Sequence, residues 1–335
     1  MGICSRVLVT GGAGFVGSHL VDRLLTEGFD VTVLDDFSGG QMRNVSFHKD
    51  DGNFRLVRGD VRDAGLVETI VKDVDAVFHE AALVDVPLSV ENPRLFNDVN
   101  VVGTLNLLQA CRDSGVGRFV FASSAAVYGD LQPAKKNERM ILKPASPYAV
   151  SKLAAENYVR VFNELYGLET VSLRYFNVYG PRQRFSSSYG AAIITFISRL
   201  LKGKPPIIYG DGAQTRDFVH VDDVVSANIL ALHSKNAVGA TLNIASGTAI
   251  TINDLVEILQ QITKSEGLKP IYKEQRAGDV KHSVGDISEA KELLGFRPKT
   301  ELNHGLSKLV EWYSSLSNTQ ESEENSRSAC ANTII

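Results

Sequence analysis

The chain contains 335 residues, of which 44% are hydrophobic and 22% charged, a composition typical of a folded globular protein and too apolar for a disordered or collagen-like chain. Thirty-five basic and 39 acidic residues give a net charge of −4, and no Lys/Arg cluster indicates a nucleic acid or an anionic membrane as a partner. The length predicts two domains, or one large domain with an elaborated second lobe.

Membrane insertion and export are not indicated by the sequence. No apolar run reaches the roughly 18 residues of a transmembrane helix, and a strand-like run that starts at Arg6 leaves no room for a signal peptide. Cys4, Cys111 and Cys330 are widely spaced, which suits a reducing compartment and neither a disulfide framework nor a zinc site. The seven histidines are scattered as well. We therefore expect a cytoplasmic protein without a bound metal.

Short β-branched runs alternate with amphipathic helical stretches through the first half of the chain. Runs such as VLV, AVF and FVFA lack the alternation of a half-exposed strand, which indicates parallel strands covered on both faces. This βαβ order predicts an α/β fold with a Rossmann-type, doubly wound parallel sheet. The predicted strands are 6–10, 30–34, 54–57, 75–79, 118–123 and 170–174.

The pattern changes after residue 174 to loops rich in Gly and Pro between helical runs, which predicts a smaller second α/β lobe. Helices are predicted over 193–201, 221–232, 251–262 and 302–315, the third with Thr251 as its N-cap. We expect residues 1–175 to form the Rossmann domain, with 218–246 returning to it, and residues 176–217 and 247–316 to form the second lobe. Residues 317–335 are mostly small and polar, which predicts a disordered tail.

A glycine-rich turn follows the first predicted strand, in the sequence VLVTGGAGFVGSHL. Gly11 permits a tight turn, Gly14 lets the backbone approach a pyrophosphate, and Gly17 lets the following helix pack closely, so that the helix N-terminus can bind phosphates. A tight turn without a ligand is the alternative. Asp35 ends the second strand, where a carboxylate can bind the ribose hydroxyls of NAD and would repel the 2′-phosphate of NADP. Asp60 is a weaker candidate, for the adenine edge.

Tyr148 and Lys152 lie four residues apart in SPYAVSKLAAENY, so that on a helix they share one face. A nearby ammonium favours the phenolate of a tyrosine and could let it accept a hydroxyl proton at neutral pH. Such a pair is more often a coincidence of surface residues. However, the strand 118–123 leads into Ser124, which places a hydroxyl at the carboxyl edge of the sheet, where ligands of such folds bind.

Taken together, these motifs resemble the extended short-chain dehydrogenase/reductase family, and within it the nucleotide-sugar epimerases and dehydratases. The resemblance covers about residues 6–315. It implies Ser124, Tyr148 and Lys152 as the catalytic residues. The motifs that carry it, in order along the chain, are TGGAGFVG, the Asp35 carboxylate, GDVRD, HEAA, NVVGT, SSAAVYG, YAVSK, RYFNVYGPRQ and GDGAQTRDFVHVDD.

The same resemblance implies a cofactor site, a substrate site and a dimer. Lys152 and Tyr148 would also contact NAD, and the further NAD contacts would be Gly11, Gly14, Phe15, Val16, Asp35, Asp60, Val61, Ala81, Asn100 and Tyr175. Asn177, Arg216 and Arg276 would hold the diphosphate of a UDP-sugar, although Arg216 could instead pair with Asp217. Helices around 92–111 and 149–162 would form a homodimer contact.

The residues after Ser124 bear on the reaction. Dehydratases of this family need an acid pair just after the catalytic hydroxyl, and related decarboxylases carry a Glu two residues on, whereas this chain has Ala125 and Ala126. Without an acid, elimination lacks its leaving-group catalyst. The resemblance then implies 4-epimerisation of a UDP-hexose through a 4-keto intermediate, with transient hydride transfer to NAD. The alternatives are a 4,6-dehydratase, a UDP-glucuronate decarboxylase, or an NAD-binding scaffold without turnover.

One position is expected to set substrate size. In UDP-galactose epimerases of this family, the residue seven positions after the second diphosphate arginine lies at the sugar C2 group, where Tyr excludes an N-acetyl group and a small residue admits it. Counting from Arg276 reaches Ser283. We therefore expect UDP-N-acetylglucosamine to be accepted as well as UDP-glucose.

Overall fold

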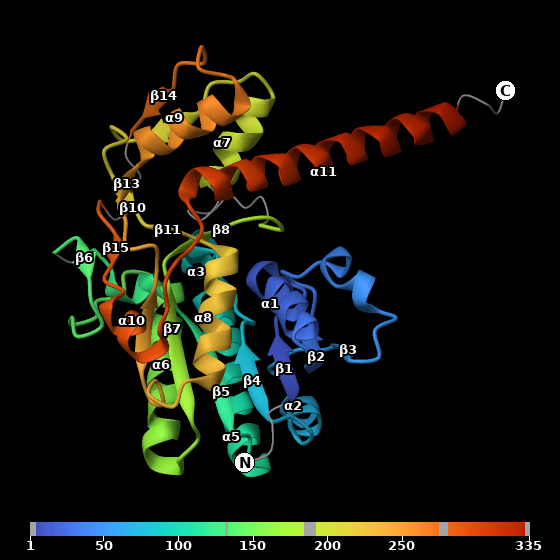
Figure 1. Cartoon of the computed structure of the whole chain (residues 1–335), viewed down its shortest axis with the longest axis vertical. Helices are drawn as coiled ribbons and strands as arrows, with labels where there is room; N and C mark the ends of the chain where they lie inside the picture. The colour runs from blue at the N-terminus through green and yellow to red at the C-terminus, as the bar shows by residue number, and fades with distance from the viewer. Residues whose placement is uncertain (1–4, 131–132, 184–191, 275–280, 332–335) are drawn as a thin grey trace.

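A seven-stranded parallel sheet forms the centre of the protein (Figure 1). The computed structural model describes residues 5–130, 133–183, 192–274 and 281–331, with side chains to residue 316. The strand order is that of a Rossmann-type, doubly wound sheet, as predicted. The strands in spatial order are β12 (Thr241–Ile244), β7 (Thr170–Tyr175), β5 (Arg118–Ser124), β4 (Ala76–His79), β1 (Arg6–Thr10), β2 (Asp30–Asp35) and β3 (Phe54–Arg58).

Six of these strands were predicted, and each is confirmed to within one residue at its ends. β12 was not predicted as a strand. It pairs in parallel with β7, from Thr241 opposite Ser172 to Ile244 opposite Tyr175. The segment from β11 (Phe218–His220) through β12 therefore lies against the large sheet, and we propose the same division into a Rossmann domain and a second lobe that the sequence predicts.

Two sets of helices cover the two faces of the sheet, each with its own apolar core. One face packs against α1 (Phe15–Thr26), α8 (Val221–His233) and α10 (Ser288–Leu294). The other packs against α2 (Ala64–Val71), α5 (Gly103–Ser114) and α6 (Pro147–Tyr166). Both faces of the central strands are buried, which explains why these strands are apolar without alternation. Between β4 and α5 lie α3 (Val86–Glu91), α4 (Pro93–Asn97) and a π-helix (Asp98–Val102).

A second lobe with its own core stands over the carboxyl ends of the strands (Figure 1). It contains α7 (Ala192–Leu201), α9 (Ile252–Thr263) and the first part of α11 (Leu302–Ala331). Thr251 caps α9 as predicted, in a reciprocal capping box with Asp254. Two short strand pairs connect this lobe to the sheet domain, β8 (Asn177–Tyr179) with β11 and β6 (Lys135–Lys136) with β15 (Val284–Gly285). Two further pairs lie within the lobe, β9 (Ile207–Tyr209) with β14 (Ile271–Lys273) and β10 (Thr215–Arg216) with β13 (Ile250–Thr251).

The helix α11 continues to Ala331 and projects away from the rest of the molecule (Figure 1). The disorder expected for residues 317–335 stays a prediction. No Gly or Pro occurs between Leu306 and Ala331, so that no residue type in this segment ends the helix. No helix among the described residues is both long and apolar enough to span a bilayer.

Candidate active site

The glycine-rich turn joins β1 to α1 at the carboxyl edge of the sheet. Gly11 has a left-handed backbone (φ 69°), and a Cβ there would lie 2.7 Å from the amide nitrogen of Ala81 at the end of the neighbouring strand. A Cβ on Gly17 would lie 2.2 Å from the Gly11 carbonyl oxygen. Gly14 is the N-cap of α1 and provides no capping side chain. The first-turn N–H groups of α1, including those of Phe15 and Val16, therefore have no side-chain partner and can bind a phosphate.

Asp35 ends β2 directly beside this turn. Its carboxylate accepts hydrogen bonds from the backbone nitrogens of Ala13, at 2.9 Å, and Phe37, at 2.8 Å. Burial raises the pKa of Asp35, and these two hydrogen bonds oppose that shift. A carboxylate has about four acceptor positions, so that two remain for ribose hydroxyls. The cradle of glycines, the uncapped helix and this carboxylate fit the pyrophosphate and the adenosine ribose of NAD.

The remaining predicted cofactor residues line the same edge of the sheet. Asp60 follows β3 and forms an ion pair with Arg62, which lowers the pKa of Asp60. Val61 follows it and is buried. Asn100 lies in the π-helix, where its amide is hydrogen-bonded to both the N–H and the C=O of Leu83 and to the Ser151 hydroxyl. Asn100 thus connects the loop after Ala81 to α6, and π-helical turns often occur at functional sites.

The structure brings the three predicted catalytic residues together. Ser124 is the last residue of β5, and its hydroxyl caps the following 3₁₀ helix (Ala125–Tyr128) by accepting from the Ala126 N–H. Tyr148 lies in the first turn of α6, where burial raises its pKa and a hydrogen bond with Ser124 opposes that shift. Lys152 lies one turn further, with its ammonium 4.7 Å from the centre of the Phe121 ring. Burial lowers the pKa of Lys152 to about 8.

A buried ion pair holds α6 against the sheet behind these residues. Glu156, one turn beyond Lys152, accepts hydrogen bonds from Arg174 of β7 at 2.6 and 3.0 Å. It also accepts one from the Ser123 hydroxyl at 2.6 Å. This network was not predicted from the sequence, because its members belong to three elements that are distant along the chain. It fixes the helix that carries Tyr148 relative to the strand that ends in Ser124.

Tyr175, at the end of β7, contacts Glu80, which was also not predicted from the sequence as a site residue. Its hydroxyl donates to the Glu80 carboxylate at 2.7 Å and accepts from the Asn228 amide of α8 at 2.7 Å. Glu80 follows the buried strand β4 in the motif HEAA. A charged residue at the end of an otherwise apolar strand was the signal that could have identified it.

The predicted substrate residues lie on the side of the second lobe. Asn177 pairs with β11 and donates from its amide to the Asp217 carbonyl at 3.0 Å, beside Arg216. The carboxylate of Asp217 accepts hydrogen bonds from Ser246, Gly247 and Gly285. Ser283 is half-buried, and its N–H donates to the carbonyl of Thr215, the residue before Arg216. Asn177, Arg216 and Ser283 thus belong to one region, whereas Arg276 lies outside the described residues.

Comparisons with known proteins agree with this fold and this site. The family model described as GDP-mannose 4,6 dehydratase matches residues 8–309. A structure of a UDP-N-acetylglucosamine 4-epimerase from Methanobrevibacter ruminantium is 41% identical, covering 93% of this chain and 99% of that one, with a TM-score of 0.89. A UDP-glucose 4-epimerase from Mycolicibacterium smegmatis is 38% identical over 92% of this chain and 98% of its own length.

The similar structures also include a dehydratase. A dTDP-glucose 4,6-dehydratase from Streptomyces venezuelae, solved with NAD bound, is 35% identical, covers 92% of this chain and 97% of that one, and has a TM-score of 0.85. Family membership therefore establishes an enzyme of the epimerase/dehydratase type without selecting one reaction. The chain belongs to the extended short-chain dehydrogenase/reductase family of NAD-dependent nucleotide-sugar epimerases and dehydratases, and its cofactor is NAD.

Proposed function

We propose that the protein is a UDP-hexose 4-epimerase that interconverts UDP-glucose with UDP-galactose and UDP-N-acetylglucosamine with UDP-N-acetylgalactosamine. The observation that carries this proposal is the arrangement around Ser124, where a serine and a tyrosine hydroxyl meet and the next two side chains are the methyl groups of Ala125 and Ala126. The epimerases among the similar proteins support it.

Each side chain of the proposed site has its own role in the reaction. Tyr148 accepts the proton of the sugar 4-hydroxyl, and Ser124, hydrogen-bonded to the phenol, holds or relays that proton. The ammonium of Lys152, one turn along α6, favours the phenolate and holds the nicotinamide ribose. NAD, when bound, supplies a carbon that can take up and return a hydride. Asn177 and Arg216 bind the diphosphate, which allows the sugar to turn while the nucleotide stays fixed.

The two alanines oppose dehydration. Ala125 and Ala126 are half-buried and begin the 3₁₀ helix directly after Ser124. Their methyl groups cannot donate a proton to the C6 hydroxyl, so that water elimination across C5 and C6 would lack general acid catalysis, an effect of about 10²–10⁴-fold. A 4-keto sugar formed here is therefore expected to be reduced again on either face.

The direct test is to incubate the purified protein, without added NAD, with UDP-glucose and separately with UDP-N-acetylglucosamine, and to follow the sugar C4 configuration by NMR. Conversion of either substrate to its C4 epimer supports the proposal. Release of a 4-keto-6-deoxy sugar would instead identify a dehydratase, and release of carbon dioxide from UDP-glucuronate a decarboxylase. An absence of any sugar oxidation after NAD is added would favour a non-catalytic scaffold.

Ser283 is the residue that we propose to admit the N-acetyl group. It lies next to the segment that carries Arg216 and has a small side chain. Ser283→Tyr should abolish turnover of UDP-N-acetylglucosamine and leave the turnover of UDP-glucose nearly unchanged. Ser283→Ala is the matched control and should keep both activities. Loss of both substrates in the tyrosine variant, or of neither, would contradict this role.

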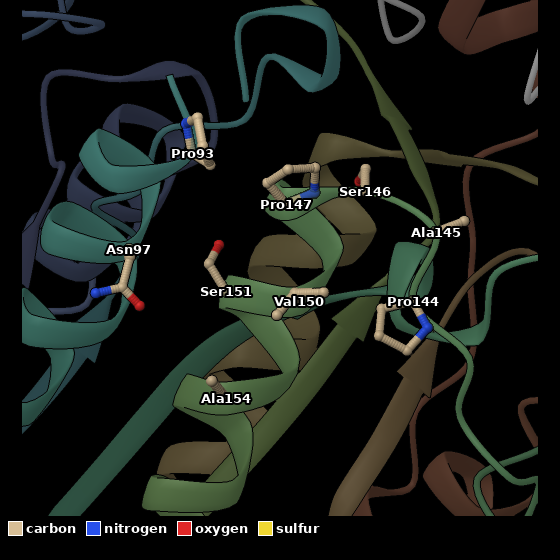
Figure 2. A pocket seen from close by; sticks show the side chains of 9 residues that line it. All are labelled: Pro93, Asn97, Pro144, Ala145, Ser146, Pro147, Val150, Ser151 and Ala154. Atoms are coloured by element: carbon tan, nitrogen blue, oxygen red, sulfur yellow. The ribbon is translucent and has the colours of Figure 1, made fainter. Parts of the chain in front are cut away.

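We also propose a homodimer through the helices around residues 92–111 and 149–162, which are α4, the π-helix, α5 and α6. Val150, Tyr158 and Leu165 expose 52%, 42% and 71% of their surface along one side of α6. A groove of about 570 Å³ lies beside this face, between α6 and α4 (Figure 2). A second copy would cover this apolar surface.

Light scattering should give twice the chain mass for the wild type, and Tyr158→Glu should lower the measured mass. A monomeric wild-type protein would refute the dimer. The groove is lined by Pro93, Asn97, Pro144, Ala145, Ser146, Pro147, Val150, Ser151 and Ala154.

A further inference from the structure

Residues 36–48 form a loop that follows β2 and lies against the proposed NAD site; we call it the 36–48 loop. A Cβ on Gly40 would lie 2.6 Å from the carboxylate of Asp35, so that the loop passes directly over this side chain. Further along, the buried amide of Asn44 donates a hydrogen bond of 2.9 Å to the carbonyl oxygen of Ala13 in the glycine-rich turn. A ribose bound to Asp35 would therefore lie next to this loop.

The far end of the 36–48 loop is fastened to α1 by one carboxylate. Asp22, on α1, accepts a hydrogen bond of 2.8 Å from Nε2 of His48 through one of its oxygens. The other oxygen pairs with the Arg182 guanidinium at 2.8 Å. The guanidinium also lies over the Phe47 ring, with its central carbon 5.5 Å from the ring centre. We call this group of four side chains, which are Asp22, Phe47, His48 and Arg182, the clasp.

Arg182 reaches the clasp from the segment that follows β8. Its backbone is left-handed (φ 66°), a conformation that a residue with a Cβ keeps only where surrounding contacts hold it. One such contact is made by the preceding Pro181, whose carbonyl accepts a hydrogen bond of 2.9 Å from His19 of α1. Phe37, in the 36–48 loop, is also left-handed (φ 63°). Of the three residues other than glycine with this backbone in the described part of the chain, two therefore lie in segments that the clasp joins.

We propose that the clasp sets how long NAD stays bound. Asp22 is then a positioning residue: through His48 and Arg182 it holds the 36–48 loop beside Asp35, where the adenosine ribose binds. The N-terminus of the same helix faces the pyrophosphate, so that α1 positions the cofactor at two places. Loss of the Asp22 carboxylate frees the loop and lets NAD leave faster. The proposal depends on NAD as the cofactor and on no particular sugar reaction.

The burial of the clasp determines the size of the expected effect. The side chains of Asp22, His48 and Arg182 are 31%, 16% and 18% exposed, so that water screens these charges less than those of a surface ion pair. Asp22→Ala removes both hydrogen bonds and leaves a good helix former on α1. The loss of one hydrogen bond to a charged group corresponds to about tenfold in an equilibrium or rate constant. We therefore expect NAD to dissociate about tenfold faster, or more, from this variant.

The first test measures NAD exchange and needs no sugar. Protein loaded with radiolabelled NAD is mixed with an excess of unlabelled NAD, and the label that remains on the protein is counted over time, well below the melting temperature. Arg23→Ala is the matched control, because it changes the next residue of α1 and breaks only the exposed pair with Glu27. It should exchange NAD at the wild-type rate. If Asp22→Ala lowers the melting temperature but exchanges NAD at the wild-type rate, the clasp is merely structural and the proposal is overturned.

Two further variants test whether the clasp acts as one unit. Phe47→Ala keeps every charge and removes a ring that is 57% exposed, so that the core is not disturbed; it should also exchange NAD faster than the wild type. Arg182→Ala retains the bond between His48 and Asp22 and should lie between the wild type and Asp22→Ala. The double variant Asp22→Ala, Arg182→Ala should be no faster than Asp22→Ala alone. Rate increases that multiply in the double variant would contradict a shared contact.

Hydrogen–deuterium exchange shows whether the effect passes through the loop. In the NAD-bound protein, peptides that cover the 36–48 loop should lose protection in Asp22→Ala and keep it in Arg23→Ala, whereas peptides from β1 and β4 should be unchanged in both. Faster loss of NAD with an unchanged loop would refute the positioning role of Asp22. Neither measurement involves a UDP-sugar, so that a failure of the proposed epimerase function would leave this result standing, and the reverse.

Discussion

The buried ion pair between Glu156 and Arg174 provides the sharpest test of how the fold supports the site. Their side chains are 7% and 4% exposed, and the carboxylate accepts three hydrogen bonds, two from Arg174 and one from Ser123. Glu156→Gln removes the negative charge and replaces one carboxylate oxygen with an amide NH₂ group. This group would face the hydrogen-bond donors of Arg174 or Ser123. The guanidinium then remains buried without its counter-ion.

The burial of this ion pair determines how much folding stability the substitution should remove. Removing one partner of a buried ion pair destabilises a protein by about 3–5 kcal/mol, because the remaining charge stays desolvated. The matched control is Glu164→Gln, two turns further along α6. Glu164 pairs with Arg160 four residues earlier, with side chains 52% and 50% exposed, and an exposed pair of this kind contributes about 0.3–0.5 kcal/mol. Urea denaturation of both variants and the wild type measures the difference.

Glu156→Gln should also change the catalytic rate. Glu156 raises the pKa of Lys152, and Ser123 precedes Ser124, which is proposed to be catalytic, so that Glu156→Gln should lower kcat more than it changes KM. If Glu156→Gln and Glu164→Gln lose the same stability, within about 0.5 kcal/mol, the assignment of this network as the anchor of α6 is wrong. A double Glu156→Gln, Arg174→Met variant should recover part of the loss, because no uncompensated charge is left.

Three further predictions concern the cofactor and catalytic residues. Tyr148→Phe should lower turnover by about 10²–10⁴-fold and keep bound NAD; turnover within tenfold of the wild type would exclude Tyr148 as the base. The Gly17→Ala protein should purify without NAD, because the added Cβ would lie 2.2 Å from the Gly11 carbonyl oxygen. Gly267→Ala is the control and should retain NAD, because nothing lies within 4 Å of a Cβ at that position. Because the pKa of Lys152 is about 8, its charge is lost as pH rises through 8, and kcat should fall there; an unchanged kcat at about pH 10 would contradict this role.

The Rossmann domain was predictable because its signals are local. Each strand is an apolar run, the glycine turn occupies seven consecutive residues from Gly11 to Gly17, and Tyr148 and Lys152 are one helical turn apart. Short spacings fix relative positions within one element or one turn, so that sequence and geometry agree there. The structure also places Ser124 against Tyr148, which the order of the motifs alone could only suggest.

The parts that escaped prediction depend on contacts between distant segments. β12 has only four residues, and it becomes a strand because β7 offers an open edge. Glu80 lies 95 residues before its partner Tyr175, and Asn228 a further 53 residues on. No spacing rule connects such residues. Their chemistry is visible only once the parallel sheet brings the carboxyl ends of β4 and β7 to the same edge.

The same reasoning explains why the cofactor is settled while the substrate is a proposal. The residues proposed to bind NAD belong to one turn, one carboxylate and one helix face of a domain whose geometry follows from its local sequence. The proposed sugar site involves the second lobe, which contains short paired strands such as β10 and β13. Small changes in the segments that join those strands alter the space around the sugar without disturbing the sheet. Substrate preference can therefore diverge among proteins that retain the same turn, the same Ser124–Tyr148–Lys152 arrangement and the same cofactor, so that Ser283 and its neighbours must be tested by substitution.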